Sequence, residues 1–205
     1  MKLYYSKGAC SLSPHIVLCE LGLPHEIEKV DLKAHTTATG TDFYSINPKG
    51  YVPVLQLANG ERLTEGPAIV QYLADQKIEG GLLPLAGTLE RARVQEWLNF
   101  IGTELHKNFS PLFNPNSTDA AKENALAAIN KRLAYIDKAL AGKNYLTGDR
   151  FCVADAYLFT IVNWTGPMNI DLSPYSNVKA FQARVSQRPA VQQAMKAEGL
   201  IQPAD

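Results

Sequence analysis

The chain has 205 residues, of which 46% are hydrophobic and 20% charged, and its 20 Lys and Arg residues balance its 20 Asp and Glu residues. This composition is that of an ordinary globular protein and excludes a disordered or fibrous chain. A net charge of zero disfavours a nucleic-acid-binding protein, which needs a basic surface to neutralise phosphates.

The first residues, Met1 to Ser6, show neither the apolar core nor the cleavage pattern of a signal peptide. No run of about 18 apolar residues indicates a membrane-spanning helix. The three cysteines, Cys10, Cys19 and Cys152, are a sparse and odd-numbered set, unlike that of a disulfide-stabilised secreted domain. We therefore expect a cytoplasmic protein that binds no membrane and keeps its thiols reduced.

The first half of the chain alternates strand and helix signals. Residues 2–6 predict a strand. Ser13 followed by Pro14 predicts the N-cap and first position of a helix that ends at Leu21, before Gly22. Residues 27–32 predict a second strand, which completes a βαβ order.

A hairpin and a second helix follow. Residues 52–57 and 62–64 predict two strands, and Asn59-Gly60 between them is a strong hairpin turn signal. A helix then begins at Gly66-Pro67 and runs to residue 75. The order βαβ and then ββα predicts a compact α/β domain over residues 1–78.

The composition changes after residue 78, where Gly80, Gly81, Pro84 and Gly87 predict a linker over residues 79–87. Beyond the linker, apolar residues recur at helical spacing and no strand is indicated. The helices are expected around residues 94–105, 126–140, 153–163, 177–186 and 190–196. Residues 88–205 are therefore predicted to form an all-helical domain, so the fold class is α/β followed by all-α.

Cys10 is the most informative residue because it lies between the first strand and the first helix. The amides and the dipole of a helix N-terminus favour a negative charge, and they can lower the pKa of a thiol from roughly 8.5 to ~3.5–7.5. No second cysteine follows within three residues, so the partner thiol would be a small thiol substrate. A lone cysteine is also commonly a buried apolar residue, and we interpret Cys19 and Cys152 in that way.

Two further features of the first half suit a ligand with amino-acid ends. If the Val52–Pro53 bond is cis, the N–H and C=O of Val52 point outward; an ordinary trans proline at a strand edge is the alternative. At the following helix N-terminus, the Gly66 N–H can bind an anion and the Glu65 carboxylate an amine. Glu65 could equally do no more than complement the helix dipole.

A polar strip lies opposite the apolar stripe of the predicted helix around residues 94–105. Its residues are Asn99, Thr103, His106 and Ser110, which fall within about 60° of one another at about 100° per residue. The strip could be a solvated helix face or the wall of a polar cleft. A solvated face usually carries Glu, Lys and Arg, and this strip has none, which favours the cleft. In such a cleft His106 would supply a proton or orient a thiolate. Glu104 and Lys107 flank the strip and would meet a charged ligand at its edges.

Together these motifs resemble those of the bacterial beta-class glutathione transferases, from one end of the chain to the other. The matching segments of the first half are KLYY (2–5), GACSL (8–12), NPKGYVPVL (47–55) and LTEG (63–66). Those of the second half are EWLNF (96–100), ELHK (104–107), VADAYLF (153–159) and EGLI (198–201). The combination of Cys10 with His106 is specific to this class among related transferases.

The resemblance implies a thioredoxin-like N-terminal domain, a helical-bundle C-terminal domain and a homodimer, with glutathione as co-substrate and no metal or other cofactor. Cys10 and His106 would be catalytic, Cys10 forming a mixed disulfide with glutathione, and Pro53 would be cis. The residues implied to contact glutathione, some across the dimer, are Cys10, His35, Val52, Glu65, Gly66, Asn99, Thr103, Glu104, His106 and Lys107. A second pocket for apolar electrophiles would be lined by Phe109, Phe113 and Trp164, although aromatic residues on helices are usually core.

The chain departs from the family pattern at three positions. His35 stands where a lysine commonly contacts glutathione, so this contact is expected to depend on pH. Gly66 replaces a Ser or Ala and lacks a possible hydroxyl contact. Cys152 replaces the Ser or Thr that usually caps the helix containing Asp155.

The expected function is therefore the transfer of glutathione to small apolar electrophiles, accompanied by thiol–disulfide exchange through Cys10. An alternative from another class is a binding protein that sequesters apolar ligands without turning them over, because this fold also serves as a ligand-holding module. No feature of the sequence suggests binding to nucleic acid.

Overall fold

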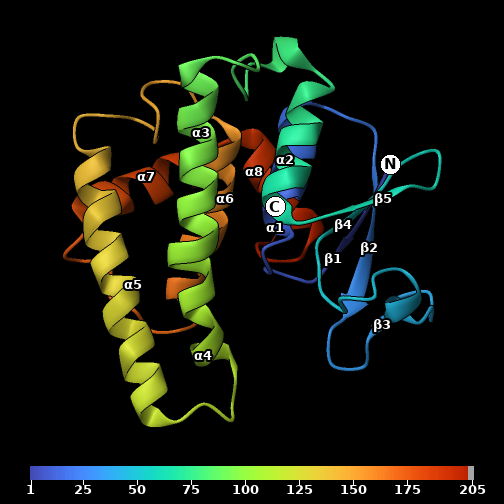
Figure 1. Ribbon diagram of the computed structural model, residues 1–205, viewed down its shortest axis with the longest axis horizontal. Coiled ribbons are helices and arrows are strands. Elements are labelled where there is room, and N and C mark those ends of the chain that lie inside the picture. The colour runs from blue at the N-terminus through green and yellow to red at the C-terminus, as the bar shows by residue number, and fades with distance from the viewer. Residues whose placement is uncertain (203–205) are drawn as a thin grey trace. The chain divides into compact units, whose positions relative to one another are not determined.

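The computed structural model describes residues 1–202 of the chain. The contacts within the chain define two compact units (Figure 1). One contains Met1–Gly81 together with residues 187–202, and the other contains Leu82–Ser186. Each unit has its own set of buried apolar side chains.

The first unit is built on a mixed five-stranded sheet. Its strands are β1 (Lys2–Tyr5), β2 (Glu26–Asp31), β3 (Thr36–Thr37), β4 (Val54–Gln56) and β5 (Arg62–Thr64). They lie in the order β3-β2-β1-β4-β5, with β1 and β2 parallel and the other neighbours antiparallel. The other elements of this unit are α1 (Leu12–Glu20), η1 (Phe43–Ser45), α2 (Gly66–Asp75), η2 (Ile78–Gly80) and α8 (Pro189–Ala197).

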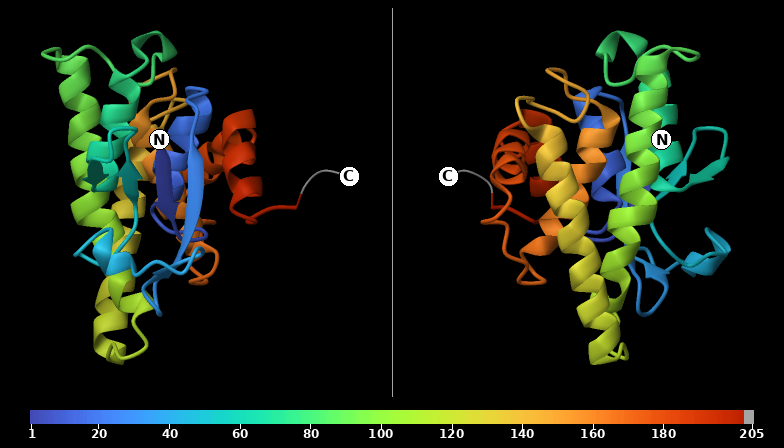
Figure 2. Two further views of the ribbon diagram at one scale, coloured as in Figure 1. Left: turned by 90° about the vertical axis from the view of Figure 1, so that its right-hand side faces the viewer. Right: turned by 60° about the vertical axis from the view of Figure 1, so that its left-hand side comes forward.

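The two faces of the sheet are covered by different elements. The apolar cluster that includes η1 consists of Tyr4, Val30, Phe43, Ile46, Val52 and Val54. Because side chains alternate along a strand, Leu3 and its register partner Leu55 point to the opposite face. Both are fully buried there. α1 and α2 lie beside the sheet and pack against each other (Figure 2).

The predicted βαβ–ββα order is confirmed, and with it the thioredoxin-like fold of this half. The start of α1 differs from the prediction, because Ser11 is the N-cap and Leu12 the first helical residue. Ser13 and Pro14 both lie buried inside the first turn. Proline is tolerated there since the N–H groups of a first turn have no acceptor within the helix.

The second unit is helical, as predicted. Its elements are α3 (Leu89–Phe100), η3 (Ile101–Leu105), η4 (His106–Phe109), α4 (Ser110–Phe113), α5 (Asp119–Leu140), α6 (Val153–Val162), η5 (Asn163–Thr165) and α7 (Ser176–Ser186). Every residue of α6 is buried, as expected for a helix that is apolar around most of its circumference. The residues of α5 that face the core are Ala125, Ile129, Leu133, Ile136 and Leu140.

The helix predicted around residues 94–105 is not α-helical throughout. α3 ends at Phe100, and the chain continues as a π-helical turn, η3, and then as the 3₁₀ turn η4. A π-helical turn closes i→i+5 hydrogen bonds and therefore rotates the residues that follow it relative to an α-helix. The 100° spacing that defined the polar strip consequently fails beyond residue 100.

The C-terminal helix α8 belongs to the first unit, which differs from the predicted helical domain of residues 88–205. α8 packs on α1. The Arg188 guanidinium donates to both carboxylate oxygens of Glu20, at 2.6 and 2.9 Å. Glu198 pairs with His15 at 2.9 Å, and both side chains are buried. These polar contacts hold the segment after α7 on the first unit. Helical periodicity alone does not reveal which unit a helix packs on. Residues 203–205 of the predicted helical domain lie outside the described part of the chain.

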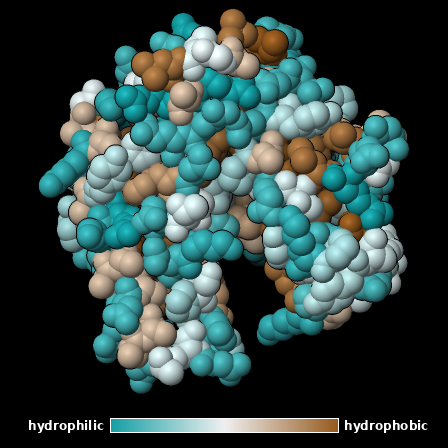
Figure 3. Space-filling view, viewed as in Figure 1, coloured by the Kyte–Doolittle hydropathy of each residue, from teal (hydrophilic) through white to brown (hydrophobic). Residues whose placement is uncertain are grey.

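No helix within residues 1–202 combines the length and the apolar character needed to cross a membrane. Hydrophilic residues cover much of the face shown in Figure 3, where hydrophobic residues form small separate groups.

Candidate active site

Cys10 lies in the loop between β1 and α1, one residue before the N-cap of α1. The loop is held by Ser11, whose hydroxyl accepts a hydrogen bond from the Ser6 N–H at 3.2 Å and donates to the Ser6 carbonyl at 3.3 Å. Gly8 makes the turn with a φ of +68°, and its N–H donates to Glu198 at 3.0 Å. The sequence prediction of a cysteine at a strand-to-helix junction is therefore confirmed.

The Cys10 thiol faces the main chain of Val52. Its Sγ donates to the Val52 carbonyl oxygen at 3.4 Å. The Val52–Pro53 peptide bond is cis, as the family resemblance implied and in contrast to the ordinary trans proline considered as the alternative. The thiol and the main chain of Val52, which lies two residues before β4, are thus brought together at one point of the first unit.

Glu65 occupies the N-cap of α2 with a φ of +69°, in the left-handed region that residues other than glycine rarely adopt. Its carboxylate accepts hydrogen bonds from Lys49 Nζ at 2.7 Å and from the Tyr51 hydroxyl at 2.8 Å. Hydrogen bonding to this carboxylate raises the pKa of both Lys49 and Tyr51. Glu65 therefore takes part in a specific polar cluster in addition to lying at a helix N-terminus.

Gly66 is the first residue of α2. A β-carbon added to it would lie 3.9 Å from the Pro53 ring, an ordinary contact distance. The backbone at Gly66 therefore leaves room for the Ser or Ala that the family pattern favours at this position.

His35 lies between β2 and β3 and is held by Tyr44. The two rings are 4.4 Å apart, and His35 Nε2 is 3.2 Å from the Tyr44 hydroxyl. The Tyr44 ring can lie here because residue 50 is a glycine, whose added β-carbon would come within 2.6 Å of it. The imidazole is thus positioned by an aromatic partner.

Glu104 and Thr103 lie in the π-helical turn of the second unit, after Asn99 at the end of α3. Glu104 accepts hydrogen bonds from Arg132 Nε and Nη2 at 3.1 and 2.6 Å. Thr103 is exposed, and its hydroxyl donates to the Asn99 carbonyl at 3.0 Å. Lys107 is exposed as well.

His106 leaves the predicted polar strip and packs toward α6. Its Nδ1 is 2.6 Å from the Tyr157 hydroxyl, and its ring lies edge-on to Trp164 with the centroids 4.9 Å apart. Asn99, Thr103 and Ser110 remain exposed. The π-helical turn between residues 101 and 105 accounts for this separation of His106 from the rest of the strip.

Phe109, Phe113 and Trp164 form one aromatic cluster in the second unit. Trp164 lies edge-on to Phe109 and Phe113, with ring centroids 5.5 and 5.1 Å apart. Phe109 is fully buried, Trp164 is 9% exposed and Phe113 is 48% exposed. Phe113 is therefore the exposed member of the cluster, and Trp164 and Phe109 support it from the core.

Comparisons with known proteins identify the family. Residues 8–76 match the glutathione S-transferase N-terminal domain, and residues 100–189 match the glutathione S-transferase C-terminal domain. A curated relative, glutathione S-transferase GstA of Escherichia coli O157:H7, is 44% identical, the match covering 98% of this chain and 100% of the relative. The chain belongs to the glutathione S-transferase family.

Solved structures support the same assignment and the class. The bacterial transferase BphK, in a ternary complex, is 55% identical with a TM-score of 0.96, over 97% of this chain and 100% of that one. The bacterial beta-class enzyme of Sphingomonas chungbukensis is 49% identical with a TM-score of 0.95, over 98% and 100% of the two chains. The beta-class assignment from the sequence motifs is thereby confirmed, and the family is a class of enzymes.

The structure also adds residues that the sequence did not single out as site residues. Lys49 and Tyr51 bind Glu65, Tyr157 contacts His106, and Arg132 contacts Glu104. Lys49, Tyr51 and Tyr157 lie inside the segments that carry the family resemblance. Their position in these segments could have marked them as site residues. Arg132 lies on α5, and nothing in its spacing distinguishes it from a solvated helix residue.

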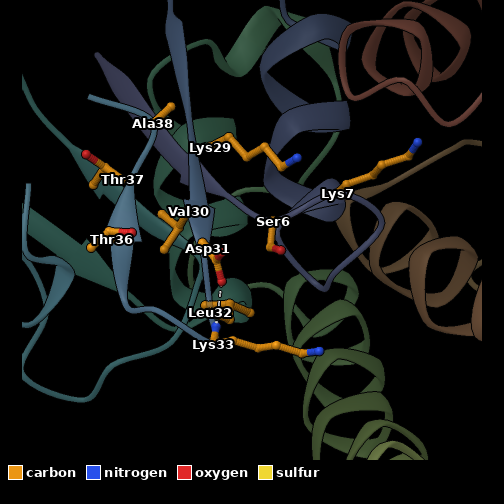
Figure 4. Close-up of a pocket in the computed structure, with 10 residues that line it drawn as sticks. All are labelled: Ser6, Lys7, Lys29, Val30, Asp31, Leu32, Lys33, Thr36, Thr37 and Ala38. Atoms are coloured by element: carbon orange, nitrogen blue, oxygen red, sulfur yellow. Dashed lines mark hydrogen bonds between the residues drawn. The ribbon is translucent and has the colours of Figure 1, made fainter. Parts of the chain in front are cut away.

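A separate hollow of about 570 Å³ lies beside β2 in the first unit (Figure 4). Lys29 and Lys33 extend along it, and Asp31 between them accepts hydrogen bonds from the Lys33 and Ala34 N–H groups. None of the predicted site residues lines this hollow.

Proposed function

We propose that this chain transfers the glutathione sulfur to small apolar electrophiles and exchanges disulfides with glutathione through Cys10. The observation that carries the proposal is the placement of the Cys10 thiol 3.4 Å from the Val52 carbonyl, immediately before α1. The amides and the dipole of the helix N-terminus favour a thiolate at such a position. A thiolate beside the Val52 main chain can attack the disulfide of a peptide-like ligand that pairs with that segment.

Val52 is the residue to which the cysteinyl unit of glutathione would pair, main chain to main chain. Its carbonyl faces Cys10, and among residues 1–202 no group accepts a hydrogen bond from its N–H. Glu65 and the Gly66 N–H would hold the γ-glutamyl amino and carboxylate groups. Lys49 and Tyr51 orient the Glu65 carboxylate for this contact.

The other glutathione contacts that we propose are distributed over both units. His35 would meet the tripeptide beside β3, in the place where the family commonly has a lysine. His106 and Lys107 would contact the bound glutathione as well. Asn99, Thr103 and Glu104 would complete the site around the γ-glutamyl group, some of them from the second subunit of a homodimer.

Disulfide exchange would proceed in two balanced steps. The Cys10 thiolate attacks the glutathionyl sulfur of a mixed disulfide, the S–S bond breaks, and the released thiolate takes up a proton. A second glutathione thiolate then attacks the sulfur bound to Cys10, which yields glutathione disulfide and restores the Cys10 thiolate. Conjugation differs because the glutathione thiolate itself attacks an electrophilic carbon. With an aryl halide a C–S bond forms, the C–halogen bond breaks and halide leaves, while His106 would stabilise the glutathione thiolate.

The second substrate would bind against Phe113 and the edge of Trp164, supported by Phe109. An exposed aromatic ring favours apolar electrophiles, since their transfer from water is favourable. We further propose a cytoplasmic homodimer. Leu85 and Leu89 of the second unit are 63% and 66% exposed, and a subunit contact would remove such apolar side chains from water.

The test against the sequestration alternative is a turnover assay with glutathione and a reactive aryl halide. Product formation that saturates in both substrates, above the uncatalysed rate, is expected. Saturable binding of the halide without product would instead assign the chain to ligand sequestration. Elution of the purified protein at the mass of a single chain would contradict the homodimer.

A further inference from the structure

Three side chains of types that bind metals lie together in the first unit, away from the residues assigned above. They are His15 and Cys19 on α1 and His25 in the loop that follows it. One potential ligand atom of each lies within 4.8 Å of those of the other two. His15 and Cys19 are four residues apart, so they project from the same face of the helix.

The loop after α1 delivers His25 to this face. Gly22 adopts a φ of +60°, its N–H donates to the Cys19 carbonyl at 3.1 Å, and the Leu23 N–H donates to the Leu18 carbonyl at 3.0 Å. These two hydrogen bonds form a Schellman motif, which ends a helix and turns the chain back along it. His25 then comes directly before β2, and its ring lies 5.5 Å from that of His15 in an edge-on arrangement.

In both His15 and His25 the Nδ1 atom is engaged in a hydrogen bond. The Nε2 atom is therefore the one that can bind a metal. His15 Nδ1 is 2.9 Å from a Glu198 carboxylate oxygen, and His25 Nδ1 is 2.7 Å from the Leu23 carbonyl. Carboxylates and carbonyls accept hydrogen bonds, so Nδ1 carries the proton in each neutral ring and the lone pair is on Nε2. Histidines that bind metals almost always donate their other N–H in this way.

The surroundings suit a divalent cation. Two carboxylates lie beside the cluster, because Glu198 contacts His15 and Glu20 directly follows Cys19 on α1. A metal binds a cysteine as its thiolate, so binding of a cation would release the Cys19 proton. His25 is only partly buried, so the cluster reaches the surface at this residue.

We propose that His15, Cys19 and His25 form a binding site for Zn²⁺, through the two Nε2 atoms and Cys19 Sγ, with water in the fourth position. On binding, the Cys19 S–H bond breaks, its proton passes to solvent and a Zn–S bond forms, with no change in oxidation state. Tetrahedral zinc with Zn–S of about 2.3 Å and Zn–N of about 2.0 Å places its ligand atoms about 3.3–3.6 Å apart. The ligand atoms of the cluster lie within 4.8 Å of one another, so they would have to move closer together to bind the ion.

Such a site would stabilise the segment that carries Cys10. The Glu198 carboxylate contacts His15 through Oε1 and the Gly8 N–H through Oε2. Gly8 lies two residues before Cys10. The proposed metal would therefore join α1, the loop after it and the segment following α8 into one connected unit.

The test uses the Cys10→Ser protein, stripped with a chelator and kept free of glutathione, because Cys10 and glutathione both bind zinc. Zn²⁺ is titrated in competition with a chromogenic chelator, and Co²⁺ is used as a spectroscopic probe. One ion per chain, a thiolate-to-cobalt charge-transfer band, the visible bands of a tetrahedral site and a higher melting temperature are expected. Adding Cys19→Ser should remove the charge-transfer band and weaken Zn²⁺ binding at least 10-fold.

Two further variants keep the outcome interpretable. His25→Gln, in a loop where misfolding is not expected, should weaken Zn²⁺ at least 10-fold while the far-ultraviolet circular dichroism is unchanged. Cys152→Ser, which removes a thiol of the other unit, should leave the affinity as it is. The proposal is overturned if the Cys10→Ser protein binds no stoichiometric Zn²⁺ or Co²⁺, or if Cys19→Ser and His25→Gln leave the affinity and the spectrum unchanged.

Discussion

The Cys10 thiol donates a hydrogen bond to the carbonyl oxygen of Val52 at 3.4 Å. This contact places the sulfur at the edge of a main-chain segment that a peptide can pair with, next to the N-terminus of α1. It links the two properties that the proposed chemistry needs, which are a reactive thiol and a binding surface for a tripeptide.

Cys10→Ser is expected to separate the two activities. A serine hydroxyl is not ionised at neutral pH and cannot attack a disulfide, so reduction of glutathione mixed disulfides should fall to the uncatalysed rate. Conjugation uses the sulfur of glutathione and should be retained within about 10-fold. Both rates are measured on the same preparation. Equal loss of both activities would show that Cys10 also serves conjugation.

Glu65→Gln should weaken glutathione binding. A glutamine retains the hydrogen-bond geometry toward Lys49 and Tyr51 but loses the charge that pairs with the γ-glutamyl ammonium. Charge-assisted hydrogen bonds contribute about 1.5–3 kcal/mol, so KM for glutathione should rise about 10- to 100-fold while kcat changes less. Glu61→Gln, an exposed position on the neighbouring hairpin, is the matched control. An unchanged KM in Glu65→Gln would remove this residue from the site.

Tyr157→Phe should alter catalysis through His106. The variant removes the hydroxyl that lies 2.6 Å from His106 Nδ1, a contact of about 1 kcal/mol. We expect kcat for conjugation to fall about fivefold and the pH profile of kcat to shift, because the imidazole loses a partner that fixes its orientation. Tyr135→Phe, an exposed tyrosine of the same unit, should have no effect. A purely structural role for Tyr157 would lower the melting temperature without moving the pH profile.

Cys152→Ser should stabilise the protein. Asp155 already accepts a hydrogen bond from the Cys152 N–H at 2.9 Å, which is half of a capping box for α6. A serine hydroxyl is a far better acceptor for the helix N–H than a thiol, and it can donate to the same carboxylate. The expected gain in free energy of unfolding is about 0.5–2 kcal/mol. Chemical denaturation measures it, and an equal or lower stability would mean that burying the hydroxyl outweighs the improved cap.

The parts of the fold and of the site that depend on short stretches of sequence could be predicted from the amino-acid sequence alone. Cys10 could be placed because a strand pattern, a loop and a helix start follow one another within a few residues. The same holds for Glu65, which directly precedes a Gly-Pro helix start. The cis geometry of Pro53 came from the family resemblance, since spacing alone does not separate cis from trans.

The features that were missed depend on contacts between distant residues or on irregular backbone. Nothing in the periodicity of residues 189–197 shows that α8 packs on α1. The π-helical turn at residues 101–105 turns His106 toward Tyr157, and a calculation at 100° per residue cannot include it. Likewise His25 reaches Cys19 only because a Schellman motif folds the chain back.

The most direct test of the proposed chemistry is the intact mass of the protein after exposure to glutathione disulfide at neutral pH. We predict a rapid mass increase of one glutathionyl group per chain, lost in Cys10→Ser and reversed by reduced glutathione. Burial raises the pKa of Cys19 to about 11 and that of Cys152 well above its usual value, so neither should react. An unmodified wild-type protein, or an adduct that persists in Cys10→Ser, would contradict the assignment of Cys10 as the reactive thiol.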